Sequence, residues 1–299
     1  MGPVPMDSAA SVLLQGQRFT VVGAAGFVGS RLCATLKARG AQVWAPARDE
    51  PWPWHRPLGH VLYCAGLTAD YLARPFNTVQ AHVSHLAAVL QHGLQHGAMD
   101  SLVYLSSTRL YDALGDSLAR EDAVLPMAPA NPRHLYDLSK ALGESLCQVA
   151  GQGRARVARL ACVYEGLRDA DGFLPALLRQ VQVARNTGAQ VVEVASSPHF
   201  TRDYVHVDDV VEALIRIALH GHEPVYNVAS GANVSNAELF AYLERRTGCQ
   251  VRGLLDTLPA PVPAVCIDRL VAELQWHPQP LLKVLDQILD TDPGGPSPC

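Results

Sequence analysis

Several features are scarce in this 299-residue chain. No apolar run approaches the ~20 residues that span a bilayer. No basic segment precedes an apolar stretch between Met1 and Gln17, so no secretory signal is predicted. Charged residues make up only 17%, and a formal net charge of −4 without a basic stripe argues against nucleic acid as the main partner. With 48% hydrophobic residues, the composition is typical of a soluble enzyme, and we expect a cytoplasmic protein that acts on a small molecule.

The cysteines and histidines give no sign of disulfide bonds or of a metal site. The seven cysteines are scattered, odd in number and without a C-x-x-C pair. We interpret them as small buried residues in a reducing compartment, not as disulfides or a zinc site. His92 and His96 are four residues apart, but glycines interrupt that segment, so a solvated helix end is expected and no metal site is predicted.

The rest of the chain is organised around residues 19–29. An apolar run at 19–22 predicts a buried parallel strand, and an amphipathic helix is predicted from Phe27 to Arg39. The intervening glycines have the spacing G-x-x-G-x-x-G, a turn that directs backbone N–H groups and the positive helix end at a pyrophosphate. A glycine-rich surface turn is the alternative. The residues predicted to bind the cofactor here are Gly23, Gly26, Phe27, Val28 and Gly29.

The second predicted strand, residues 41–47, bears on the choice of cofactor. Its carboxyl end meets the adenosine ribose in dinucleotide folds, where a carboxylate binds the ribose hydroxyls and an arginine binds a 2′-phosphate. No carboxylate occupies this position and Arg48 is adjacent, which favours NADP over NAD, unless Arg48 is only a solvated loop charge. The following loop, 50–60, holds three prolines and is too short for a further strand with its helix.

Strands and helices continue to alternate beyond this loop. A strand is predicted at 60–66, a helix at 74–96 and a strand at 101–106. This alternation predicts an α/β fold with a Rossmann-type, doubly wound parallel sheet. Ala65 is a small residue at a strand end, so it lets a cofactor pass close by and is predicted to line the cofactor site.

The residues with reactive side chains follow the strand at 101–106. Ser107 leaves the sheet at the carboxyl edge, where ligands bind. Asn131 and Pro132 begin a predicted helix that places Tyr136 and Lys140 on one face, four residues apart. A lysine ammonium beside a phenol stabilises the phenolate and lowers the pKa of the tyrosine toward neutrality. An ordinary surface pair on a helix is the alternative interpretation of Tyr-x-x-x-Lys.

At this point the sequence resembles the extended short-chain dehydrogenase/reductase family, in its NAD-dependent epimerase/dehydratase branch. The resemblance extends over about residues 17–290. It rests on three motifs, G-A-A-G-F-V-G at 23–29, S-S-T-R-L-Y at 106–111 and Y-D-L-S-K at 136–140, and on the more specific block R-D-Y-V-H-V-D-D-V at 202–210.

The resemblance implies roles for individual residues. Ser107 matches the catalytic Ser/Thr, Tyr136 the general acid/base, and Lys140 the residue that binds the nicotinamide ribose and tunes the tyrosine. Arg202 matches a substrate-side arginine that often contacts a nucleotide phosphate, with a salt bridge to Asp208 or Asp209 as the alternative. A homodimer formed through the helix that bears Tyr136 and the helix before it is also implied.

Departures from the family pattern concern the substrate side. Members that dehydrate or decarboxylate sugars carry acidic residues just after the catalytic Ser/Thr, whereas this chain has Thr108 and Arg109. Cys162 stands where an asparagine usually helps to hold a sugar nucleotide. The predicted substrate-binding residues are therefore Thr108, Cys162 and Arg202, and a standard sugar nucleotide is in question.

The expected organisation has a disordered lead at 1–16 and a dinucleotide-binding domain at 17–165, with 203–221 also packing on it. Residues 166–290 form mainly a smaller, interwoven substrate lobe, and 291–299 form a frayed tail. A capping serine at 235 with Glu238 begins one of the helices of this lobe.

The functional hypothesis is an NAD(P)-dependent oxidoreductase or epimerase that moves hydride at a carbinol or keto carbon of a sugar nucleotide or other small polar metabolite. An NADPH-dependent ketoreductase of a non-sugar substrate is one alternative. A non-catalytic dinucleotide sensor is another, although a sensor has no need of Ser107, Tyr136 and Lys140.

Overall fold

The computed structural model describes residues 13–47, 50, 56–169 and 171–290. A six-stranded, wholly parallel sheet forms the centre of the larger part of the molecule, in the order β2-β1-β3-β4-β5-β9. Its strands are β1 (Arg18–Val22), β2 (Gln42–Trp44), β3 (Gly59–Tyr63), β4 (Met99–Ser107), β5 (Ala155–Leu160) and β9 (Val225–Val228). The predicted doubly wound sheet is confirmed, and within the described residues no strand lies beyond β2.

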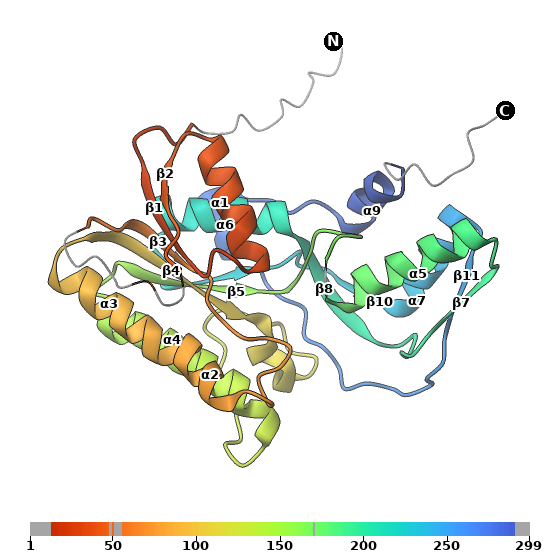
Figure 1. Ribbon diagram of the computed structural model, residues 1–299. Helices are drawn as coiled ribbons and strands as arrows, with labels where there is room; N and C mark the ends of the chain where they lie inside the picture. The colour runs from red at the N-terminus through yellow and green to blue at the C-terminus, as the bar shows by residue number, and fades with distance from the viewer. Residues whose placement is uncertain (1–12, 48–49, 51–55, 170, 291–299) are drawn as a thin grey trace, which may run out of the picture.

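Helices cover both faces of this sheet (Figure 1). One face carries α1 (Phe27–Ala38), α6 (Val207–His220) and α8 (Asp268–Leu274). The other carries α2 (Pro75–Val79), the π-helical turn η1 (Gln80–Ser84), α3 (His85–Gln95) and α4 (Leu135–Ala150). The short 3₁₀ segments η2 (Thr108–Leu114) and η3 (Pro132–His134) lead from β4 to α4.

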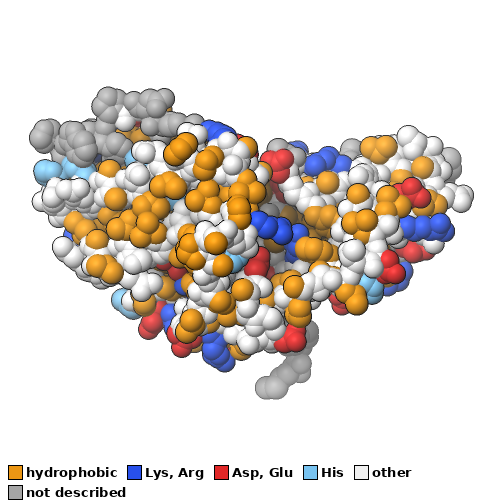
Figure 2. All heavy atoms as spheres, turned by 90° about the horizontal axis from the view of Figure 1, so that it is seen from below, with side chains coloured by type: hydrophobic (Ala, Val, Ile, Leu, Met, Phe, Trp, Pro, Cys, Tyr) orange, Lys and Arg blue, Asp and Glu red, His pale blue; other side chains and the backbone are white. Residues whose placement is uncertain are grey.

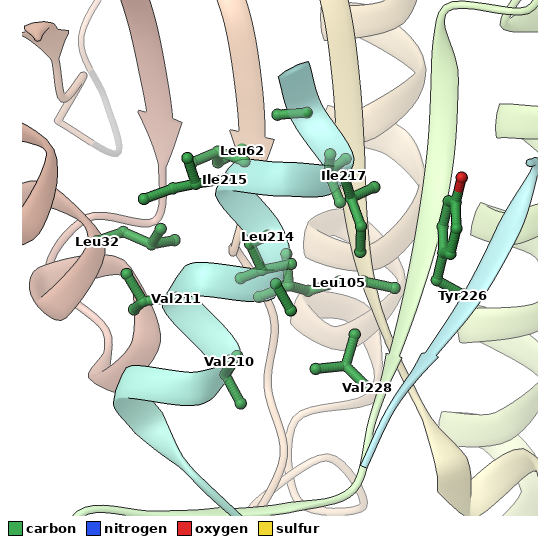
Figure 3. Close-up of a cluster of buried hydrophobic side chains, with 14 of the residues drawn as sticks. Leu32, Leu62, Leu105, Val210, Val211, Leu214, Ile215, Ile217, Tyr226 and Val228 are labelled. Carbon is green, nitrogen blue, oxygen red and sulfur yellow. The ribbon is translucent and has the colours of Figure 1, made fainter. Parts of the chain in front are cut away.

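The larger core lies between α6 and the sheet. Figure 3 shows Val211 and Ile215 of α6 turned toward Leu32 of α1 and Leu62 of β3, with Leu214 beside Leu105. The i, i+3, i+4 spacing of these α6 residues produces one apolar stripe, and its burial anchors the helix on the sheet.

The smaller part has its own core and two small sheets (Figure 1). One sheet has the order β10-β8-β6, and the other pairs β11 with β7. Its strands are β6 (Cys162–Tyr164), β7 (Val191–Val194), β8 (Thr201–His206), β10 (Asn233–Ser235) and β11 (Gln250–Gly253). Its helices are α5 (Phe173–Thr187), α7 (Asn236–Thr247) and α9 (Leu281–Asp290). The predicted Ser235–Glu238 capping box is confirmed at the start of α7.

Three local expectations were wrong. The lead is ordered from at least residue 13, because Leu14 inserts into the core and its N–H pairs with Arg39. His92 is buried, not solvated, since Gly93 lets α3 lie close against Met99. Cys162 is exposed, whereas cysteines were expected to be buried. Among the described segments, no helix is long and apolar enough to cross a membrane.

A buried ion pair joins α4 to β5. The guanidinium of Arg159 binds both carboxylate oxygens of Glu144, with Nη2 2.6 Å from Oε2, and both side chains are 4% exposed. Ser106 donates to Glu144, and Arg159 donates to the Tyr111 hydroxyl. These bonds fix the helix that carries Tyr136 and Lys140 against the sheet.

We predict that Glu144→Ala lowers the free energy of unfolding by about 3–5 kcal/mol, because it leaves the Arg159 charge buried and unpaired. Urea unfolding measures the loss. Asp70→Ala breaks a solvent-exposed pair with Arg74 and serves as the control, with an expected loss of about 0.3–0.5 kcal/mol. Equal losses in the two variants would contradict this role for the buried pair.

Candidate active site

The glycine turn has a geometry that tolerates no side chains at two positions. Gly23 has a φ of +83°, and a Cβ there would lie 2.7 Å from the backbone N of Ala65. A Cβ on Gly29 would lie 2.3 Å from the carbonyl oxygen of Gly23. These glycines therefore let α1 pack on β1 and bring Ala65, just after β3, against the turn.

The start of α1 fits the phosphates of a dinucleotide. Gly26 is the N-cap and supplies no side-chain hydrogen bond, and no acidic residue occupies the first turn. The first N–H groups of a helix lack intrahelical partners, so those of Phe27 and Val28 are available to an anion. Arg48, predicted to select the cofactor, lies outside the described residues.

Tyr136 and Lys140 project from α4 beneath the carboxyl edge of β4. Both are nearly buried, with exposures of 5% and 4%. Ser107, the last residue of β4, accepts a hydrogen bond from the N–H of Arg109 and caps η2. The three predicted catalytic residues therefore meet at one place, because α4 packs directly on β4 and β5.

Lys140 is held by the sheet and lies beside two aromatic rings. Its Nζ donates to the carbonyl of Leu105 at 2.7 Å and lies 4.9 Å from the ring centre of Tyr104 and 5.9 Å from that of Tyr136. Burial lowers the pKa of Lys140 to about 7, although Glu144 opposes this. Near neutral pH the lysine therefore exchanges a proton readily.

The structure corrects the sequence-based expectation for the pKa of Tyr136. Burial raises the pKa of this phenol above its usual value, while a hydrogen bond with Ser107 and the charge of Arg109 lower it. Asp137 acts in the same direction as burial. Burial, not the charge of Lys140, therefore sets the direction of the shift in the pKa of Tyr136.

His82 is a neighbour of Tyr136 that sequence reasoning missed. It lies in the π-helical turn η1, fully buried, with its ring edge-on to that of Tyr136 at 5.4 Å. Its Nε2 accepts from the N–H of Leu67, so its Nδ1 is the donor to Ser139. Burial lowers the pKa of His82 to about 3, which keeps the imidazole neutral. No sequence motif marks a π-turn, so nothing in the chain pointed to it.

Arg109 and Tyr71 also contact the tyrosine. The Arg109 guanidinium lies 5.1 Å from the ring centre of Tyr136 and 5.0 Å from that of Tyr71. The two tyrosine rings are 5.5 Å apart. Arg109 was noticed in the sequence only as a departure from the family pattern, because its position two residues after Ser107 does not reveal where its side chain points.

The predicted substrate residues lie on the side facing the smaller part. Thr108 begins η2 and is partly exposed, while Cys162, at the start of β6, pairs in register with Tyr204 of β8. Arg202 of β8 stacks on Phe200, with its guanidinium carbon 4.0 Å from the ring centre. Figure 2 shows a hollow between the two parts of the molecule, with basic and acidic side chains in it.

The alternative interpretation of Arg202 as a salt-bridge partner was wrong. Asp208 instead binds Arg31, with Nε 2.6 Å from Oδ1, and Asp209 accepts from the backbone of Gln279. No carboxylate of the described part of the chain lies within ion-pair distance of Arg202. Its charge acts on Asp112 without forming an ion pair, and it opposes the rise that burial causes in the pKa of that carboxyl.

A glycine turn at a helix start and a Ser–Tyr–Lys set at the edge of a parallel sheet define a dinucleotide-dependent enzyme of the Rossmann class. Residues 19–229 match the model of the NAD dependent epimerase/dehydratase family. The chain belongs to this family and is an NAD(P)-dependent enzyme of the extended short-chain dehydrogenase/reductase type, as the sequence predicted.

Relatives named for an activity match three quarters of the chain or more. It is 26% identical to the dTDP-4-dehydro-6-deoxy-D-allose reductase of Streptomyces bikiniensis, across 91% of this chain and 95% of the relative. It is 30% identical to the GDP-6-deoxy-D-mannose reductase of Pseudomonas aeruginosa, across 76% and 79%. The solved structure of RMD from Pseudomonas aeruginosa complexed with NADPH is similar to this one, with a TM-score of 0.72, 25% identity and coverage of 92% and 98%.

The low pKa of Lys140 predicts the direction in which the free energy of unfolding changes with pH. Between about pH 7 and the unfolded value near 10.5, the unfolded chain binds a proton that the folded protein does not. We expect the unfolding free energy of the wild type, relative to Lys140→Met, to rise with pH across this window, with a slope approaching about 1.4 kcal/mol per pH unit.

Urea unfolding of both proteins from pH 6 to pH 10 tests this expectation. The difference should be flat below pH 7, where both states are protonated. Lys37→Met, which removes an exposed lysine of α1, is the control and should show no slope. A difference that stays flat up to pH 10 would show that Lys140 keeps its charge in the folded state.

Proposed function

We propose that this protein reduces the keto group of a nucleotide-linked 4-dehydro-6-deoxy sugar with NADPH. The observation that carries the proposal is the convergence of Ser107, Tyr136 and Lys140 beneath the carboxyl edge of β4, with the unpaired Arg202 on the substrate side. Relatives across nine-tenths of the chain are named as reductases of such sugars, which supports this choice.

The chain's own residues assist the transfer. The cofactor supplies hydride when it is bound. Ser107 binds the keto oxygen of the substrate, and Tyr136 donates its phenolic proton to that oxygen as the hydride adds to the carbon. Lys140, fixed by the Leu105 carbonyl, binds the nicotinamide ribose and lies near the tyrosine ring. The Arg202 guanidinium binds a phosphate of the nucleotide by charge-assisted hydrogen bonds.

Reduction fits the site better than dehydration. Dehydration removes a proton from carbon and protonates a leaving hydroxyl, work suited to carboxylates placed next to Ser107. The chain instead has Thr108 and Arg109 there. An epimerase, which oxidises its substrate and then re-reduces the keto intermediate with the same retained cofactor, is the second candidate, favoured by the match to the epimerase/dehydratase model.

Nucleotide analysis after denaturation separates these two candidates. Stoichiometric NAD released from the purified protein would favour the epimerase. A protein that purifies without nucleotide and binds NADPH more tightly than NADH would favour the reductase. The structure with NADPH of a relative 25% identical supports the second outcome.

For activity, we predict that the wild type oxidises NADPH, followed by absorbance, when given a dTDP- or GDP-linked 4-dehydro-6-deoxyhexose. Tyr136→Phe should lower kcat by at least about 100-fold, because the proton donor is lost, while the Kd for NADPH is preserved. Tyr242→Phe, which removes a hydroxyl bonded to Asp286 in the smaller part, is the matched control and should retain activity. Full activity in Tyr136→Phe would remove the tyrosine from the mechanism.

We further propose that the protein forms a homodimer through the face of α2, α3 and α4. Phe76 on α2 is 89% exposed. Leu142 and Val149 lie seven residues apart on α4, so they share one exposed side of that helix. An apolar groove runs beside them, lined by α3 and α4 residues that include Leu90, Leu94 and Leu146. Apolar surface of this kind marks an interaction site.

Light scattering coupled to size exclusion measures the oligomeric state. We expect a wild-type dimer and a monomeric Leu142→Glu/Val149→Glu variant, because two charges would be buried without partners at the interface. Val183→Glu, at another exposed apolar position, on α5, should stay dimeric. A monomeric wild type would refute the proposed interface.

A further inference from the structure

Hydrogen bonds and an ion pair hold the Arg109 side chain against the ring of Tyr136. Its Nη2 donates to the hydroxyl of Tyr71 at 3.0 Å and to the carbonyl of Arg133 at 3.1 Å. Its Nε lies 3.2 Å from Oδ1 of Asp137, a close ion pair. These partners belong to three different segments, so they hold the guanidinium in one place over the Tyr136 ring at 5.1 Å.

The backbone of Arg109 acts on the same site. Its N–H donates to the Oγ of Ser107 at 3.2 Å. With that lone pair occupied, the serine hydroxyl proton remains free to point at Tyr136 or at a substrate oxygen. One residue therefore orients Ser107 through its main chain and contacts Tyr136 through its side chain.

Lys140 is less suited than Arg109 to supply a lasting positive charge. The Lys140 Nζ is 5.9 Å from the Tyr136 ring centre and bonded to the Leu105 carbonyl, and its pKa is about 7. An arginine stays protonated at every physiological pH. Among the described residues, the titratable and charged groups around Tyr136 include Tyr104 of β4, Asp137 and Lys140 of α4, Arg109 of η2, His82 of η1, Tyr71 of the loop before α2, and Arg133 and His134 of η3.

We propose that Arg109 is a positioning residue of the reaction: it holds a permanent positive charge against the Tyr136 ring and stabilises the phenolate that forms when Tyr136 gives its proton to the substrate. The proposal rests on the proposed function for its substrate, but its physical content concerns Tyr136 alone. Hydride arrives at the carbonyl carbon, the phenolic proton goes to the carbonyl oxygen, and the negative charge left on Tyr136 faces the guanidinium.

A purely structural role for Arg109 is the competing explanation. Arg109 neutralises Asp137, which is nearly buried, and removing the arginine alone leaves that carboxylate unpaired next to Tyr136. A shift in the ionisation of Tyr136 then has two causes, the lost cation and the exposed anion. The experiment therefore needs a background in which Asp137 is already neutral.

The ionisation of Tyr136 can be followed without any substrate. A fluorinated tyrosine, more acidic than tyrosine itself, is incorporated at position 136 alone, and its ¹⁹F shift is titrated with pH in the full-length protein. The proteins compared are the parent, Arg109→Gln, Arg109→Lys, Asp137→Asn and the Arg109→Gln/Asp137→Asn pair. Far-UV circular dichroism and thermal unfolding check that each variant is folded.

We expect Arg109→Gln to raise the ionisation midpoint by about one pH unit or more, and Arg109→Lys to raise it less because the charge is kept. Asp137→Asn should lower the midpoint. The deciding comparison is between Asp137→Asn and the double variant: a higher midpoint in the double variant supports the proposal, and equal midpoints overturn it. Should Arg109→Gln fail to fold, the comparison of Arg109→Lys with the parent decides. The lysine ammonium lies in a different place from the guanidinium, so a higher ionisation midpoint of Tyr136 in Arg109→Lys supports the proposal, and an unchanged midpoint overturns it.

The reaction supplies a second readout. In the NADPH assay, the alkaline limb of the kcat/KM profile should move with the ¹⁹F midpoint across the same variants, and Kd for NADPH should stay constant. Absence of turnover in the parent would refute the proposed function and leave the ¹⁹F result standing. Unchanged midpoints in an active enzyme would refute the role of Arg109 and leave the proposed function standing.

Discussion

The site depends on the buried ion pair between Glu144 and Arg159. Both charges are removed from water, so their desolvation must be offset by each other and by the hydrogen bonds from Ser106 and to Tyr111. The bonds act only in one relative placement of α4 and β5. Since Tyr136 and Lys140 lie on α4 and Ser107 ends the neighbouring β4, that placement sets the distances among these three residues.

Sequence reasoning found what backbone periodicity and glycine spacing determine. The strand, turn and helix at 18–38, the parallel doubly wound sheet, and the helix face shared by Tyr136 and Lys140 follow from local patterns and from the alternation of strands and helices. It did not find His82, Tyr71 or the placement of Arg109. These depend on a π-turn, a loop and a 3₁₀ segment, where one residue of register changes which way a side chain points.

The protonation behaviour of the site was the part that the sequence predicted least well. The sequence shows a lysine four residues from a tyrosine, and the usual inference is an acidified phenol. The structure shows that Tyr136 and Lys140 are both almost fully buried, and burial disfavours the charged form of each. Whether a charge lowers or burial raises the pKa of a phenol depends on depth and packing, which no spacing along the chain encodes.

The path of the chain between the two parts restricts how the substrate specificity of such a protein can evolve. After β6, the polypeptide builds α5 and β7, returns through β8 and α6 to β9 of the large sheet, and leaves again for β10 and α7. The smaller part is therefore built from several separate segments of the chain, so recombination could not exchange it as one continuous piece. New specificity in such an architecture arises by replacing single residues, while the fold is inherited as a whole.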